Sequence, residues 1–168
     1  MEELVHKDSV RVGLSGSIFL LQYESTATIS AAKLLDDVLV RRFDANPGAK
    51  WGIIVVIDSS NPPPDDKTRA AISQSMKGKG RGDRVSALAY VVIGSGFRAG
   101  AIRASLVTLN LLSQSAYPKK VFSKLSDAVE WISATAPTVL KALDVPRTKT
   151  AIEAFQAAYK PPTPQARV

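Results

Sequence analysis

The stretch from residue 85 to residue 112 constrains the fold most, because it reads as an apolar strand, a glycine turn and a long apolar helix in direct succession. Residues 85–93 are an almost unbroken apolar run rich in β-branched side chains. Such a run is typical of a strand covered on both faces in a parallel or mixed sheet. Gly94, Gly96 and Gly100 then lead the backbone into the helix. We therefore expect this strand near the middle of a sheet.

The remaining segments alternate strand-like and helix-like patterns in the order β-β-α-β-α-β-α-β-α-α-α. The expected strands are residues 10–14, 17–23, 51–58, 85–93 and 120–122, and the expected helices cover residues 26–43 and 99–112 and begin near residues 66, 127, 137 and 150. This alternation predicts an α/β fold. It consists of a single mixed, mainly parallel β-sheet with helices packed on it, followed by C-terminal helices.

Local signals refine these boundaries. Ser15-Gly16 is a tight connection that predicts an antiparallel hairpin at one edge of the sheet. Asp65 or Asp66 is suited to cap the helix that follows three prolines. Capping-box patterns predict the starts of two later helices, and these are Asp127 with Glu130 and Thr150 with Glu153.

The length of 168 residues suits one domain with its own core. We expect an α/β domain over residues 1–136, a helical extension over 137–160 and a proline-rich, disordered tail over 161–168. No apolar run reaches the roughly 18 residues of a membrane span, and the acidic, mixed start is unlike a secretory signal peptide. The protein is therefore expected to be cytoplasmic.

The side chains that most often carry catalysis are scarce. The chain has no cysteine, and its one histidine, His6, lies near a terminus that we expect to be frayed. Asp65 and Asp66 are interpreted as helix caps. With neither a metal motif nor a Walker lysine motif, we expect no enzyme activity, no catalytic residues, no metal and no cofactor.

A family resemblance rests on two segments, the apolar strand before GFRAGAIRA (residues 96–104) and then YPKKVFSKLSDAVEWI (residues 117–132). They resemble the bacterial branch of the STAS-like family, which is related to anti-sigma-factor antagonists. In that branch a short strand with Phe precedes a helix ending in an Ala…Trp-Leu pattern, and the corresponding residues are Phe122, Ala128, Trp131 and Ile132. The resemblance covers residues 10–135. It implies a small α/β domain that binds proteins or ligands and does no chemistry.

STAS regulators often carry a phosphorylatable serine at a helix N-terminus, and Asp58-Ser59-Ser60 invites that comparison. Three prolines follow here, where the family usually has a short turn that contains glycine. We therefore interpret Ser59 and Ser60 as turn residues and not as phosphoacceptors.

The glycine turn has three interpretations. Its spacing is GxGxxxG, whereas a dinucleotide fingerprint is GxGxxG within the first βαβ unit. A weaker anion site at the helix N-terminus is the better functional hypothesis. Its residues would be Gly94, Ser95, Gly96, Phe97, Arg98 and Arg103. The alternative is that Gly96 and Gly100 only allow close packing of the helix on the sheet, with Arg98 as a solvated cap.

Positive charge is concentrated in the middle of the chain. The net charge is +7, and residues 67–103 hold 8 basic side chains and 1 acidic one. A basic loop contains Lys77, Lys79, Arg81 and Arg84. It suits an anionic partner or simply keeps the loop soluble. The loop has no interleaved aromatic residues, so the sequence does not favour nucleic acid as the partner.

The long helix needs a cover on its outer side. Between residues 99 and 112 the only charged side chain is Arg103, and apolar residues occur on all sides. The C-terminal helices within residues 137–160 are our first choice for this cover, and a homodimer is the alternative.

Together these features predict a non-catalytic regulatory or protein-interaction module with a partner of unknown identity. The expected contact face combines the Ser59–Lys67 loop, the Gly94–Arg98 turn and the basic loop. The Ser59–Lys67 loop and the Gly94–Arg98 turn both follow the carboxyl end of a strand, whereas the basic loop does not. The opposite end of the sheet is therefore an alternative position for the basic loop.

Overall fold

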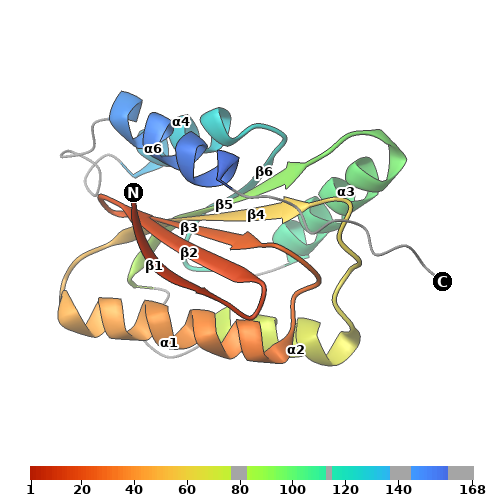
Figure 1. Cartoon of the computed structure of the whole chain (residues 1–168), viewed down its shortest axis with the longest axis horizontal. Coiled ribbons are helices and arrows are strands. Elements are labelled where there is room, and N and C mark those ends of the chain that lie inside the picture. The colour runs from red at the N-terminus through yellow and green to blue at the C-terminus, as the bar shows by residue number, and fades with distance from the viewer. Residues whose placement is uncertain (77–82, 113–114, 137–144, 159–168) are drawn as a thin grey trace.

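Six strands form one mixed sheet whose order in space follows their order in the chain (Figure 1). The computed structural model describes residues 1–76, 83–112, 115–136 and 145–158. Its strands are β1 (Glu2–Lys7), β2 (Val10–Ser15), β3 (Ile18–Tyr23), β4 (Trp51–Asp58), β5 (Val85–Ile93) and β6 (Lys119–Phe122). The first three strands pair antiparallel, and β3 to β6 pair parallel. The predicted mixed, mainly parallel sheet is therefore confirmed.

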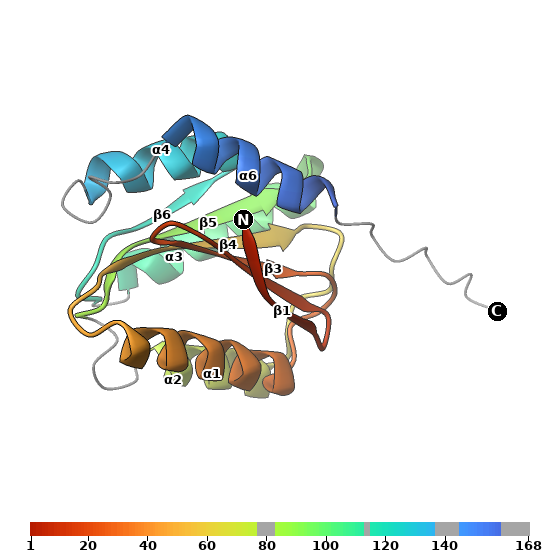
Figure 2. The same ribbon diagram turned by 60° about the vertical axis from the view of Figure 1, so that its left-hand side comes forward.

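Helices cover both faces of this sheet, as Figure 2 shows. They are α1 (Ile29–Ala45), α2 (Asp66–Met76), α3 (Gly96–Leu112), α4 (Leu125–Thr135) and α6 (Val145–Ala157). The helices α1 and α2 lie on one side, whereas α4 and α6 lie on the other. The helix expected near residue 137 and the tail expected at 161–168 lie outside the described residues.

Alternation along the strands divides the core into two clusters, because successive side chains point to opposite faces. On the α1 side, Phe19, Phe43 and Trp51 form an aromatic group, with the Phe19 and Trp51 ring centres 5.1 Å apart. On the other side, strand residues such as Ile18 pack under Ile132 of α4 and under α6. A Cβ at Gly13 in β2 would run into the side chains of Met1 and Phe155, so this glycine allows α6 to approach the sheet closely.

Two expectations about the sheet were wrong. Residues 2–7 form strand β1 instead of a frayed terminus, so the hairpin of β2 and β3 is not the edge of the sheet. Within β1, His6 Nε2 lies 2.9 Å from a carboxylate oxygen of Glu24. In addition, β5 is only the second strand from the β6 edge and does not lie in the middle.

One predicted helix cap is confirmed and two are wrong. The carboxylate of Asp65 accepts from the Thr68 N–H at 2.7 Å at the start of α2. The helix α4 already begins at Leu125, whose side chain is buried against the sheet, so Asp127 lies inside its first turn. The helix α6 begins at Val145, so Thr150 lies inside the helix. In both cases a buried contact near the helix start, by Leu125 and by Val145, extends the helix beyond the cap motif.

Candidate functional site

The turns after β4 and β5 meet at the carboxyl end of the sheet. The Ser59 N–H donates to the Ile93 carbonyl at 2.9 Å. Gly94 has a φ of 110°, in the region that favours glycine, and a Cβ there would clash with the Ser59 Oγ. Gly94 is therefore the glycine that the close approach of the two turns requires.

Hydrogen bonds also fix the remainder of the β4 turn. The Asp58 carboxylate accepts from the Ser60 N–H at 2.8 Å, and the Asp58 carbonyl accepts from the Asn61 N–H at 3.1 Å. The Asn61 side chain donates to the Tyr23 carbonyl at 3.3 Å, which ties the turn to β3. Ser59 is buried and Ser60 is exposed. The loop is thus anchored to both neighbouring strands.

Both arginines of the predicted anion site donate to main-chain carbonyls. Arg98 Nη2 donates to the Asn61 carbonyl at 2.8 Å. Arg103 Nη2 donates to the carbonyls of Val92 and Gly94, each at 2.9 Å. An anion at this helix N-terminus would have to compete with these carbonyl groups for the same donors. The anion site stays a prediction, and the structure brings its residues together at the start of α3.

The packing interpretation of the two later glycines was wrong. A Cβ at Gly96 or at Gly100 would meet nothing within 4 Å, so neither glycine allows a close contact with the sheet. Gly96 has a φ of 79°, which explains a glycine at this position by backbone conformation instead. Gly100 is exposed on α3.

The outer side of α3 is exposed and apolar over most of its length, and the exposed Arg98 in the first turn donates to the Asn61 carbonyl. Phe97 is 93% exposed, Leu111 is 82% exposed and Val107 is 47% exposed. Ala101, Ala104 and Thr108 are exposed between them. The Thr108 hydroxyl donates to the Ala104 carbonyl at 3.0 Å, so its hydrogen is used within the helix. We call Phe97, Ala101, Ala104, Thr108 and Leu111 the outer stripe of α3.

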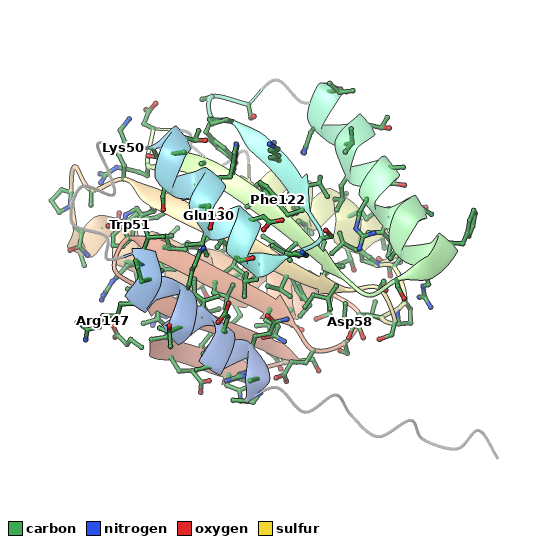
Figure 3. All side chains as sticks on the ribbon, turned by 90° about the horizontal axis from the view of Figure 1, so that it is seen from above. Lys50, Trp51, Asp58, Phe122, Glu130 and Arg147 are labelled. Atoms are coloured by element: carbon green, nitrogen blue, oxygen red, sulfur yellow. The ribbon has the colours of Figure 1, made fainter. Side chains whose placement is uncertain are left out.

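Helix α6 does not cover this stripe, which corrects our first choice for the described part of residues 137–160; residues 137–144 lie outside the described residues. In the described residues α3 packs against β5 and β6, whereas α6 packs against α4 and β2. Figure 3 shows α3 on one side of the molecule, away from α6. The physical reason is that α4 and α6 complete the core on the opposite face of the sheet, where Ile132, Ile152 and Phe155 are buried. The sequence indicated an apolar helix, but the outer stripe was not predicted. The signal that could have revealed the stripe is the spacing of residues 97, 101, 104, 108 and 111.

The basic loop does not join the turns of β4 and β5 in the part that the structure describes. Lys77, Lys79 and Arg81 lie outside the described residues. The fourth residue, Arg84, lies at the amino end of the sheet, where its carbonyl accepts from the Trp51 N–H at 2.8 Å. Its guanidinium donates to the Asn46 carbonyl at 3.1 Å. Figure 3 shows Trp51 and Asp58 at opposite ends of β4, so Arg84 lies far from the Asp58 turn.

Other features of the described residues add little chemistry. One shallow pocket lies at the amino end of the sheet, and its lining residues are Lys50, Asp83, Val85, Ser86, Ala116, Tyr117, Thr135 and Ala136. Among the residues that the structure describes, no cluster of three or more His, Asp or Glu side chains could hold a metal ion. Within the same residues no helix has the length and apolar character needed to cross a membrane.

Comparison with known proteins supports the fold. No family model and no curated protein matches the sequence. A solved structure that does match is an uncharacterized protein of the DUF3478 family with a SpoIIAA-like fold, from Shewanella loihica PV-4. The TM-score is 0.56 at 11% sequence identity, and the match covers 79% of this chain and 98% of that one. The chain therefore has the SpoIIAA-like fold that the STAS-like resemblance implied.

Proposed function

We propose that this chain is a non-catalytic, regulatory protein-interaction module that binds its partner through the outer side of α3. The observation that carries the proposal is the exposure of Phe97 and Leu111 at the two ends of one uncharged helix face. Large apolar side chains that remain exposed along a contiguous surface usually mark a place where another molecule binds. Aromatic residues such as Phe97 are also enriched at protein interfaces.

The local structure suits a rigid contact surface. Arg98 ties the first turn of α3 to the Asn61 carbonyl, and Arg103 ties the next turn to the end of β5. A partner would therefore meet a helix that is already held in place, so little conformational entropy is lost on binding. The protein-binding role that the STAS-like resemblance implies agrees with this proposal.

The turns of β4 and β5 support a role without catalysis. Ser59 is the one buried hydroxyl in these turns, and its Oγ faces the α-carbon of Gly94. The two nearby guanidiniums donate to carbonyl oxygens. A nucleophilic serine needs an activating base within hydrogen-bond reach, and the described residues show none at Ser59. A domain of this kind acts by binding a partner and changing the activity of that partner. Its location in the cytoplasm is the prediction made from the sequence.

Photo-cross-linking in cells tests this proposal. A photoreactive phenylalanine analogue placed at Ala101 should give specific cross-linked products with another polypeptide, either a different protein or a second copy. The same analogue at Val40, which is 36% exposed on α1, is the matched control and should give none. If neither position yields a specific product, or if both yield the same set, the proposed contact surface is wrong.

A further inference from the structure

We infer that two copies of this chain associate through the outer stripe of α3, with the two helices antiparallel and a two-fold axis beside Ala104. The inference rests on the proposed function, because it names the partner that this helix face fits. The first argument is the spacing of the stripe, which alternates steps of four and three residues from Phe97 to Leu111. This is the heptad spacing by which two helices pack along a common seam.

The second argument is the symmetry of the stripe about Ala104. Phe97 and Leu111 both lie seven residues from Ala104, and Ala101 and Thr108 lie three and four residues from it. A two-fold interface needs one patch that is complementary to itself. In an antiparallel pair, Phe97 of each copy meets Leu111 of the other. The small residues at the centre let the two backbones approach closely.

Charge selects the antiparallel orientation. The two arginines of α3 point to main-chain carbonyls, so the stripe itself carries no charge although the chain has a net charge of +7. Parallel helices would bring the two Arg98 side chains together at one end. Antiparallel helices place Arg98 of one copy near the C-terminal end of α3 of the other, where the helix dipole favours a cation.

The surface area that one helix pair can bury predicts a weak dimer. A helix of 17 residues is about 25 Å long, so one helix pair buries less than the roughly 1,200 Å² of most stable interfaces. We therefore expect self-association that rises with protein concentration. A dimer of this kind would bury Phe97 and Leu111 without a change in the fold.

Single-cysteine variants test the arrangement cleanly, because the chain has no cysteine of its own. Under mild oxidation the A104C variant should form a disulfide-linked dimer, since Ala104 lies at the axis. F97C alone should not, because its two copies would lie about 21 Å apart along the seam. A mixture of F97C and L111C should give the mixed dimer. Ala134→Cys, at an exposed position on α4, is the matched control.

Sedimentation of the full chain provides a second measurement. The wild-type chain should shift from monomer to dimer as its concentration rises, and the Ala104→Glu variant should stay monomeric because it places two like charges at the axis. Ala134→Glu should behave as the wild type, and circular dichroism should show that both variants are folded.

Three results would overturn the dimer. They are a wild-type monomer at every concentration, A104C that cross-links no more than A134C, and F97C that dimerises alone. If the Ala101 photo-probe nevertheless captures a different protein, the proposed function survives and only its partner changes. If that probe captures nothing, both proposals fail.

Discussion

The guanidinium carbon of Arg11 lies 4.1 Å from the centre of the Phe155 ring, and Arg11 Nη1 donates to the Phe155 carbonyl at 3.1 Å. On its other side Arg11 Nη2 donates to the Glu3 carboxylate at 2.9 Å. One buried side chain in β2 thus contacts β1 and the last described helix. The contact attaches α6 to the antiparallel part of the sheet.

Replacing Arg11 by Ala should lower the free energy of unfolding by about 3 kcal/mol, because it removes a buried cation and leaves the Phe155 carbonyl without this donor. Urea denaturation followed by circular dichroism measures the change. Arg41→Ala, at an exposed position on α1, should cost less than about 0.5 kcal/mol. Equal effects of the two substitutions would show that Arg11 does not hold α6 in place.

Two glycines near the start of α3 should respond to alanine in opposite directions. Gly94→Ala should destabilise the fold by about 1–3 kcal/mol or more, because φ is 110° and the new Cβ would clash with Ser59. Gly100→Ala should stabilise it by about 0.5–1 kcal/mol, because the new Cβ meets nothing and alanine favours the helix. Thermal unfolding in dilute solution separates the two. A stabilised Gly94→Ala variant would contradict the close contact between the turns.

Two tyrosines should lose their phenolic protons at a higher pH than a solvent-exposed tyrosine does. Burial, with a smaller contribution from Tyr90, raises the pKa of Tyr23 to about 12. Burial, with a smaller contribution from Tyr117, likewise raises the pKa of Tyr90 to about 12. Absorbance titration of the phenolate should therefore show Tyr23 and Tyr90 ionising near pH 12, and the Tyr90→Phe variant should lose one of these two transitions.

The same shifts give the stability a pH dependence of known sign. An unfolded tyrosine loses its proton near pH 10, whereas these two keep it until about pH 12 in the folded chain. The folded state therefore binds more protons in this interval. Stability from these groups should be complete below pH 10 and should fall as the pH rises towards 12. Stability that rises over this interval would contradict the burial of the two phenols.

Gln22 is a buried polar side chain whose replacement should stabilise the protein. The residue is 2% exposed, and its Oε1 has no hydrogen-bond partner within the described structure. A buried acceptor without a partner is costly, so Gln22→Met should raise the free energy of unfolding by about 1 kcal/mol. Gln156→Met, on α6, should change it little. A clear loss of stability in Gln22→Met would indicate that Gln22 has a partner that this arrangement does not include.

The sequence predicted the parallel half of the fold well, because hydrophobic patterning is strong there. Residues 85–93 and 51–58 are nearly continuous apolar runs, and both are buried strands. The strand Glu2–Lys7 was missed, because four of its six side chains are exposed and its pairing is set by β2 rather than by its own pattern. Its position depends on partners such as Arg11, which no local pattern reveals.

The candidate site was predicted in part. The meeting of the Ser59 and Gly94 turns follows from the rule that parallel strands end at one edge, and the structure brings them together. The exposure of the outer stripe of α3 could not be predicted. A helix with apolar residues on all sides has the same sequence pattern whether the C-terminal helix or another molecule covers it. Only the packing of α6 on β2, far from α3, distinguishes the two.

The match between strand order and chain order has a consequence for how the molecule is made. Each new strand joins a neighbour that was synthesised just before it, so the sheet can grow one strand at a time as the chain leaves the ribosome. Every strand pairs with the strand next to it along the chain, and such local pairing favours rapid folding. The contact of Phe155 with Arg11 is much less local, because it spans 144 residues. Attachment of α6 should therefore follow formation of the sheet, because Phe155 is synthesised long after Arg11.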